Sequence, residues 1–182
     1  MQQVALLFHK LMAHFAEIKQ KTDPTGFTTD THWVVERVIV ADNNIPTSNG
    51  PLGENNKHVD GENWCKKFFN GGEWKQTSYN NSFRKKYAGT GDVYDPVNDI
   101  FRMKQPFSSW TLDSNSDWQP PVAFPGPFSG TKPAPNDNET YVLDPKWDEE
   151  NQVWYIMDGE IEPDNDSEVK RTWNPDTSTW SS

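Results

Sequence analysis

The sequence predicts a mainly β fold with a minor α+β character. A small antiparallel β domain with one short helix is followed by serial aromatic β-hairpins, which Pro-rich extended segments join. Two patterns predict the strands: an alternating run at 32–41, and pairs of aromatic residues seven positions apart from residue 94 onward. The composition predicts a core of rings. Hydrophobic residues make up only 33% of the 182 residues, yet aromatics reach 13% and include nine Trp, and each ring can cover about 150–250 Å².

The chain is expected to begin with an N-terminal extension, residues 1–11, ahead of a β-rich core domain at 12–105. Residues 4–8 of the extension form an apolar patch. This patch is too short for a membrane-spanning helix or for the apolar part of a normal signal peptide. A short docking helix and a frayed terminus both remain open for it.

The core domain begins with two predicted strands in residues 12–41, on either side of a polar loop at 23–31. The second strand alternates regularly, which suits a strand that is largely covered on both faces. One face would carry Val34, Glu36, Val38 and Val40, and the other would carry Val35, Arg37 and Ile39.

One short helix is predicted at about 60–70. Asp60 can cap its first turn, and Gly71 can end it. Its buried stripe would hold Trp64, Cys65, Phe68 and Phe69. A strand is expected next, in which Trp74, Gln76 and Ser78 alternate with Lys75, Thr77 and Tyr79.

Three segments from residue 94 onward share one pattern, in which an aromatic residue is followed by Asp or Asn, a polar turn and a second aromatic. With a two- or four-residue loop, residues seven apart lie directly opposite each other on antiparallel strands, where ring pairs contribute about 0.2–1 kcal/mol. Asn98 or Asn151 can take the left-handed conformation that closes such a loop. The predicted ring pairs are Tyr94 with Phe101, Trp147 with Trp154, and Trp173 with Trp180.

A fourth copy of this pattern, from Leu112 to Trp118, is one residue shorter. Either its loop has an odd length with a bulge, or Trp110 replaces Leu112 as the paired ring. Pro-rich joins at 119–128 and 131–135 hold the chain extended between the hairpins.

The second half therefore divides into a hairpin and Pro-rich linker at 106–135 and an acidic C-terminal hairpin arm at 136–182. Residues 133–182 hold thirteen acidic and three basic side chains, which accounts for the whole formal net charge of −10. A field of this sign disfavours nucleic acid and anionic membranes as partners. A solvated acidic end and contact with a basic partner surface both explain it.

No catalytic, cofactor-binding or metal-binding residue is predicted. The four histidines lack any metal-ligand spacing, and Cys65 is expected to pack in the core. With a single cysteine no intrachain disulfide can form, which leaves the redox compartment open. We therefore expect a binding or structural protein rather than an enzyme.

Tryptophans of the hairpins and a basic stretch together form the candidate interface. Isolated hairpins are marginal in water, so aromatic ones must pack on the main domain, on each other or on another protein. The basic stretch is expected to be an ordinary charged face, although it could stack nucleic-acid bases or receive the acidic arm of a neighbouring copy. Exposed Trp rings could also hold sugars. The candidate residues are Trp110, Trp118, Trp147, Trp154, Trp173, Trp180, Arg84, Lys85 and Lys86.

Four segments, at 12–18, 74–80, 83–89 and 106–110, carry a resemblance to a known family. They resemble small accessory virion proteins of marine tailed phages, notably cyanophages. The resemblance covers most of residues 12–128, and the closing Trp-Asp hairpins recur in those proteins. Those relatives often begin at the methionine equivalent to Met12, so residues 1–11 depart from their pattern. The resemblance supplies no catalytic residue.

The resemblance implies a structural protein located in a bacteriophage virion. Decoration or cementing of the capsid surface is the preferred role, with the major capsid protein or a tail protein and further copies of the chain as assembly partners. The alternative is a tail- or fibre-associated protein that binds a host surface glycan or receptor. Neither nucleic acid nor a membrane is expected as a partner, and no cofactor is expected.

Overall fold

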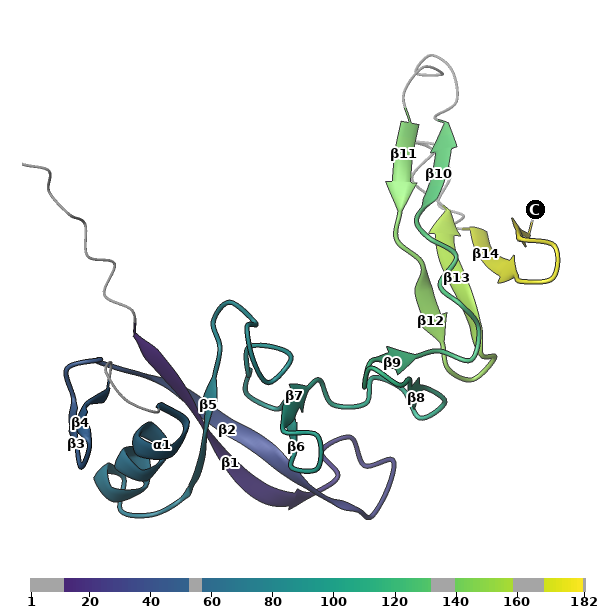
Figure 1. The fold of residues 1–182 in the computed structure, drawn as a ribbon. Helices are drawn as coiled ribbons and strands as arrows, with labels where there is room; N and C mark the ends of the chain where they lie inside the picture. The colour runs from purple at the N-terminus through teal and green to yellow at the C-terminus, as the bar shows by residue number, and fades with distance from the viewer. Residues whose placement is uncertain (1–11, 53–56, 132–139, 159–168, 182) are drawn as a thin grey trace, which may run out of the picture. The chain divides into compact units, whose positions relative to one another are not determined.

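The structure of the chain, a computed structural model, describes residues 12–52, 57–131, 140–158 and 169–181. The chain forms two compact units that meet in sequence between Lys104 and Gln105. Antiparallel strands dominate both units, and one helix lies among the described residues, which confirms the predicted mainly β fold (Figure 1). The predicted extension at 1–11 and the second Pro-rich join past residue 131 lie outside the described ranges.

The first unit is built on a five-stranded antiparallel sheet. Its strands are β1 (Ala13–Thr22), β2 (Thr31–Ala41), β5 (Glu73–Thr77), β6 (Val93–Asp95) and β7 (Ile100–Arg102). Their order in the sheet is β5-β1-β2-β6-β7. The two strands predicted around a polar loop are confirmed as β1 and β2. The strand expected next is β5, which ends before Ser78 and Tyr79.

A β-bulge in β2 changes which residues share a face. Ala16 pairs with Val38 and Ile18 pairs with Val35, so β2 holds one more residue than β1 between these two pairs. An extra residue switches the alternation beyond it. The prediction that Val35 and Val38 lie on opposite faces is therefore wrong, because both pack in one cluster with Ala16 and Ile18.

Ion pairs across the strands explain where the bulge lies. Glu36 binds Lys19 at 3.7 Å and also binds Lys21, while Arg37 binds Glu17 at 2.7 Å. These three β1 residues are two apart and share one face of the strand. Glu36 and Arg37 thus point to the same side although they are neighbours in sequence, which only a bulge allows.

The predicted helix is α1 (Lys57–Phe68), and it begins earlier than expected. Asp60 lies within its first turn, so the prediction that this residue caps the helix is wrong. At the other end Asn70, with φ of 57°, supplies the left-handed residue ahead of Gly71. The amides of both residues donate to carbonyls of the last turn, which is the Schellman arrangement. Neither the length nor the polarity of α1 fits a membrane span.

The buried stripe of α1 differs from the prediction at one position. Cys65 is fully buried, and Trp64 and Phe69 pack against the same cluster. Phe68, which was placed in the stripe, is 66% exposed. It is absent from the core cluster, and its ring stacks on Trp64 with the centroids 4.9 Å apart.

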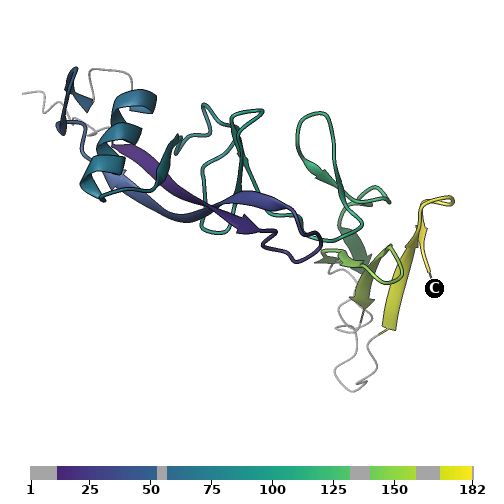
Figure 2. The same ribbon diagram turned by 90° about the horizontal axis from the view of Figure 1, so that it is seen from below.

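Two hydrophobic clusters cover opposite faces of the sheet, because residues of β1 alternate between them. The helix side holds Ala13, Phe15, Ala41, Leu52, Cys65 and Trp74. The other side holds Ala16, Ile18, Val35, Ala88, Tyr94 and Phe101. Figure 2 shows α1 against one end of the long β1–β2 ribbon. A short ribbon of β3 (Pro46–Thr47) and β4 (Gly50–Pro51) lies beside α1.

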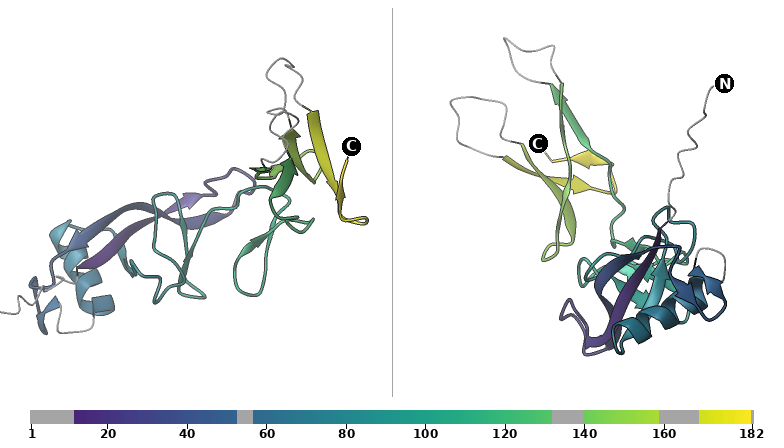
Figure 3. Two further views of the ribbon diagram at one scale, coloured as in Figure 1. Left: turned by 90° about the horizontal axis from the view of Figure 1, so that it is seen from above. Right: turned by 90° about the vertical axis from the view of Figure 1, so that its left-hand side faces the viewer.

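The second unit, Gln105–Ser182, contains both the predicted hairpin and linker at 106–135 and the predicted C-terminal arm at 136–182. It comprises a hairpin of β8 (Thr111–Leu112) and β9 (Trp118–Gln119), a second of β10 (Phe128–Thr131) and β11 (Thr140–Leu143), and a four-stranded sheet (Figure 3). That sheet runs in sequence order through β12 (Lys146–Asp148), β13 (Val153–Asp158), β14 (Val169–Asn174) and β15 (Thr179–Trp180).

The predicted ring pairs are confirmed in all three hairpins. Tyr94 is directly opposite Phe101, Trp147 opposite Trp154, and Trp173 opposite Trp180. The ring centroids are 5.3, 5.2 and 5.4 Å apart respectively, within the usual range for aromatic pairs.

The turns of these hairpins share one geometry. The residue after the first ring, as in Asp95 and Asp148, accepts hydrogen bonds from turn amides. The left-handed residue is not Asn98 or Asn151, however. It is the next one along, with φ of 50° to 53°, and the side-chain amides of both asparagines instead donate to the carboxylates of Asp95 and Asp148. The left-handed residues are Asp99, Gln152 and Ser178.

The fourth hairpin takes the first of the two predicted forms. Leu112 lies opposite Trp118, so the loop between them has an odd number of residues. Ser116 is left-handed there, with φ of 61°. Trp110 is not the paired ring.

The contact between Gly61 and Phe15 leads to a test of the helix-side core. A Cβ atom on Gly61 would lie 2.1 Å from the Phe15 ring, which is fully buried. Gly61→Ala should lower the unfolding free energy by about 1–2 kcal/mol, because overpacking of about 2–3 kcal/mol, the upper part of the usual range for so close an approach, outweighs the roughly 1 kcal/mol gained in helix propensity. Urea unfolding measures this. Asn63→Ala, at an exposed position of the same helix, should lose no stability; a Gly61→Ala variant as stable as the parent would contradict the packing.

Candidate functional site

Cys65 is the one thiol, and its surroundings make it a packing residue. It is fully buried, and burial together with the nearby charge of Glu62 raises its pKa to about 12. The thiolate form that nucleophilic chemistry requires is therefore scarce at neutral pH. Among the described residues no three His, Cys, Asp or Glu side chains are grouped so that they could hold a metal ion.

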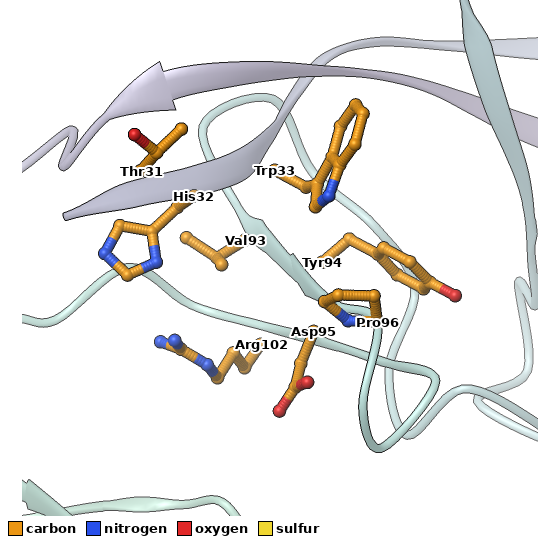
Figure 4. A pocket seen from close by; sticks show the side chains of 8 residues that line it. All are labelled: Thr31, His32, Trp33, Val93, Tyr94, Asp95, Pro96 and Arg102. Atoms are coloured by element: carbon orange, nitrogen blue, oxygen red, sulfur yellow. The ribbon is translucent and has the colours of Figure 1, made fainter.

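One hollow of the first unit opens where β2, β6 and β7 meet. It has a volume of about 310 Å³, which is the lower end of the usual range for ligand sites. Figure 4 shows the rings of Trp33 and Tyr94 on one side, and the imidazole of His32 and the guanidinium of Arg102 on the other. Sequence reasoning did not find this site, because the residues come from three strands and form no local motif.

The charges around this hollow nearly cancel. Burial lowers the pKa of Arg102, and the negative charges of Asp95 and Asp23 oppose that effect. The Asp95 carboxylate is already engaged by its own turn, where the amides of Val97 and Asn98 donate to it. The hollow thus presents ring faces and hydrogen-bonding groups with little net charge. This suits a neutral polar ligand or a covering protein segment better than a free anion.

Arg84, a member of the candidate interface, lies inside the first unit, with 8% of its side chain exposed. Its Nη1 donates to Glu62 Oε1 at 2.7 Å and to the Gln76 carbonyl at 2.8 Å, and its Nε donates to Asp99 Oδ1 at 2.8 Å. Burial alone would lower the Arg84 pKa, but Glu62 and Asp99 outweigh it and raise the pKa. One guanidinium therefore joins α1, β5 and the β6–β7 turn.

The backbone around Arg84 is also unusual. Arg84 and Lys85 both have positive φ, of 52° and 66°, a conformation that costs non-glycine residues about 1 kcal/mol or more. Lys86 pairs with Asp92. Two of the three predicted basic residues thus bind carboxylates of their own unit. Their role in contact with another molecule remains a prediction.

Three of the candidate tryptophans come together in the second unit. Trp110 lies 6.2 Å from Trp147 and 6.0 Å from Trp154, and Phe107 lies 5.6 Å from Trp110. Trp154 also contacts Phe124, and its indole N–H donates to the Val122 carbonyl at 2.8 Å, so the first Pro-rich join packs on this cluster. Trp147 and Trp154 are 7% and 6% exposed. They form the core of the unit rather than open platforms.

The remaining tryptophans lie elsewhere in the unit. Trp173 and Trp180 pair with each other, and Trp180 contacts Phe128 of β10 at 6.0 Å. Trp118 stands opposite Leu112 in the short β8–β9 hairpin. The six predicted rings are thus one group of three, one pair and one ring in a separate hairpin.

Glu149 holds the Trp110 cluster from outside, a role that sequence reasoning missed. Its carboxylate accepts hydrogen bonds from the Ser108 hydroxyl, from the amide and hydroxyl of Ser109 at 2.8 and 2.7 Å, and from the Trp147 indole N–H at 2.8 Å. These bonds, led by the one from Ser108, lower the Glu149 pKa to about 2. About forty residues separate Glu149 from Ser108 and Ser109, so no local sequence pattern predicts these contacts.

The buried pair of Arg84 and Glu62 predicts a large loss of stability when it is broken. Arg84→Met keeps most of the side-chain length and the same backbone strain, but removes the Arg84 hydrogen bonds to Glu62 and to the Gln76 carbonyl, while Glu62 still accepts a hydrogen bond from the Gln76 amide. We expect a loss of about 2–3 kcal/mol in unfolding free energy, because hydrogen bonds to charged groups contribute about 1.5–3 kcal/mol each; urea unfolding measures it. Lys66→Met is the matched control. It breaks an exposed pair with Glu73 and should cost less than about 1 kcal/mol; equal losses in the two variants would contradict the buried role.

Glu149 predicts an acid-dependent loosening of the second unit. Its folded pKa of about 2 is below the ordinary value of 4.5, so its contribution is present above pH 4.5 and is lost as the pH falls toward 2. In an NMR titration of the full chain, the indole N–H of Trp147 should lose protection from exchange over that range. In the Glu149→Gln variant, the Trp147 indole N–H should already have lost this protection from exchange at pH 7. Glu150→Gln removes one negative charge from the neighbouring residue and should leave the Trp147 signal unchanged. An identical response of the two variants would show that the hydrogen bonds of Glu149 do not protect Trp147.

The described residues therefore offer a mixed polar and aromatic hollow in the first unit, and a ring cluster closed by Glu149 in the second. Comparisons with protein-family models, with curated proteins and with solved structures gave no match for this chain.

Proposed function

We propose that the chain is an accessory structural protein of a tailed-bacteriophage virion, which decorates or cements the capsid surface through contacts with capsid subunits and with its own copies. The observation that carries this proposal is the packing of the second unit. Its hairpins are held by pairs of aromatic rings directly opposite each other, although the chain has few aliphatic residues. The sequence resemblance at 12–18, 74–80, 83–89 and 106–110 supports the same proposal.

Exposed apolar side chains on the second unit support a role in protein contact. Val142 of β11 is 62% exposed, Phe124 is 53% exposed, and Val169 of β14 is 44% exposed. Large apolar groups at the surface favour association when they lie on ordered strands and loops. The net negative charge of residues 133–182 adds a preference for a basic partner surface.

A second candidate is a tail- or fibre-associated protein that binds a host surface glycan. The hollow beside Trp33 and Tyr94 favours it, since that hollow combines ring faces with hydrogen-bonding groups and little net charge. The tryptophans of the second unit favour it less. Trp147 and Trp154 are buried against other rings, which removes them as stacking platforms.

Purified phage particles test the location. Quantitative mass spectrometry should find the chain in proportion to the major capsid protein, and a particle map should place it on the capsid. A copy number that matches tail or fibre subunits would overturn decoration in favour of the second candidate. Absence of the chain from purified particles would overturn both.

A pair of exposed valines tests the contact surface. Val142→Asp in the second unit should weaken binding of the purified chain to capsids at least tenfold, because a charge would enter an apolar contact. Val97→Asp is the matched control, since Val97 is 89% exposed in the β6–β7 turn of the first unit. Co-sedimentation with capsids measures both, and equal binding of the two variants would place the contact elsewhere.

A further inference from the structure

A second, smaller hollow lies between α1 and the β3–β4 ribbon, and nothing above assigns a role to it. Its volume is about 130 Å³, well below the roughly 300–1,000 Å³ of sites that enclose a whole drug-sized ligand. An occupant of this size is a single ring rather than a cofactor. The side chains of interest around it are Thr47, Ser48, Asp60, Asn63, Trp64 and Lys67.

The most informative of these residues is Asp60, a carboxylate that is 5% exposed. Among the described side chains, its hydrogen-bonding partner is the amide nitrogen of Asn49, which lies 3.0 Å from both carboxylate oxygens. A carboxylate can accept about four hydrogen bonds. Asp60 therefore keeps acceptor capacity for donors that a ligand brings into the hollow, and Asn49 fixes its orientation.

Trp64 supplies an apolar wall next to this carboxylate. The indole stacks on Phe68 at 4.9 Å with 22° between the ring planes, which restrains its position, and it also lines the hollow. Asp60 and Trp64 are four residues apart on α1 and thus lie on the same side of the helix. A ligand in the hollow would meet a ring and a carboxylate together.

The remaining polar groups determine which ligand suits the hollow. Lys67, one helical turn beyond Trp64, only donates hydrogen bonds, Asp60 only accepts them, and the Asn63 amide does both. The charges of Lys67 and Asp60 offset each other, which disfavours an ionic ligand of either sign. Vicinal hydroxyl groups both donate and accept, and the C–H face of a sugar ring is apolar.

We propose that this hollow binds one neutral sugar ring of a polysaccharide, which packs on Trp64 and hydrogen-bonds to Asp60, Asn63 and Lys67. The proposal is independent of the capsid or tail location of the chain. A ligand with so few atoms in an open hollow binds weakly, with a Kd in about the millimolar range. Many copies side by side would raise the effective affinity for a polymer.

The test is an NMR titration of the full-length, ¹⁵N-labelled chain with glucose, galactose, mannose and N-acetylglucosamine. At least one sugar should give saturable shifts of the Trp64 indole N–H and of amides in α1 near Asn63. Trp64→Ala and Asn63→Ala should each weaken binding at least tenfold. Asn63 is exposed, so its variant keeps the test valid even if Trp64→Ala unfolds.

Two control variants separate this hollow from other surfaces. Val59→Ala changes a residue that is 54% exposed on the same helix, and Phe27→Ala changes a ring that is 44% exposed in the loop between β1 and β2; both variants should bind as the parent does. The proposal is overturned if no sugar gives saturable shifts, or if the shifts map to Trp118 or another ring. It is also overturned if methylguanidinium, which mimics an arginine side chain, binds the hollow more tightly than any sugar.

Discussion

Cross-strand pairs of aromatic rings are the interaction on which both units depend, because the chain has few aliphatic side chains to bury. In the first unit the pair of Tyr94 and Phe101 closes one face of the sheet, where both rings join the buried cluster. In the second unit the pair of Trp147 and Trp154 is the centre on which Trp110 packs. Each pair does two things at once. It sets the register of a hairpin, and it provides the apolar surface against which more distant segments are held.

The elements that the sequence predicts well are those whose information is local. A spacing of seven residues and an Asp or Asn after the first ring determine a hairpin within one short segment, so the register of Trp173 and Trp180 could be predicted without the rest of the chain. The bulge in β2 could not, because the alternation of valines looks the same with or without it; the strand register and the ion pairs of Glu36 and Arg37 reveal it.

The same limit applies to the sites. The basic stretch reads as a surface patch because its sequence shows three cations in a row, whereas the carboxylates that bind Arg84 come from residues 62 and 99. In the sequence, nothing distinguishes Glu149 from the other acidic residues of its segment, and only the fold brings Ser108 and Ser109 to it. Both contacts join segments far apart in sequence. In both, charged side chains stabilise the fold. Among the described residues, the hollow beside Trp33 and the hollow beside Trp64 are places where polar groups retain capacity for a ligand.

The spacing of the ring pairs also has a consequence for how the chain folds. A hairpin whose partners are seven residues apart closes only a small loop and can form in about 1–10 μs. By contrast, the residue pairs that join β5 to β1 are 55 to 63 positions apart, as in the pairing of His14 with Thr77, and such non-local pairing is slow. The hairpins of the second unit can therefore form while the sheet of the first is still incomplete, and we expect the non-local pairings of β5 with β1 and of β6 with β2 to form later.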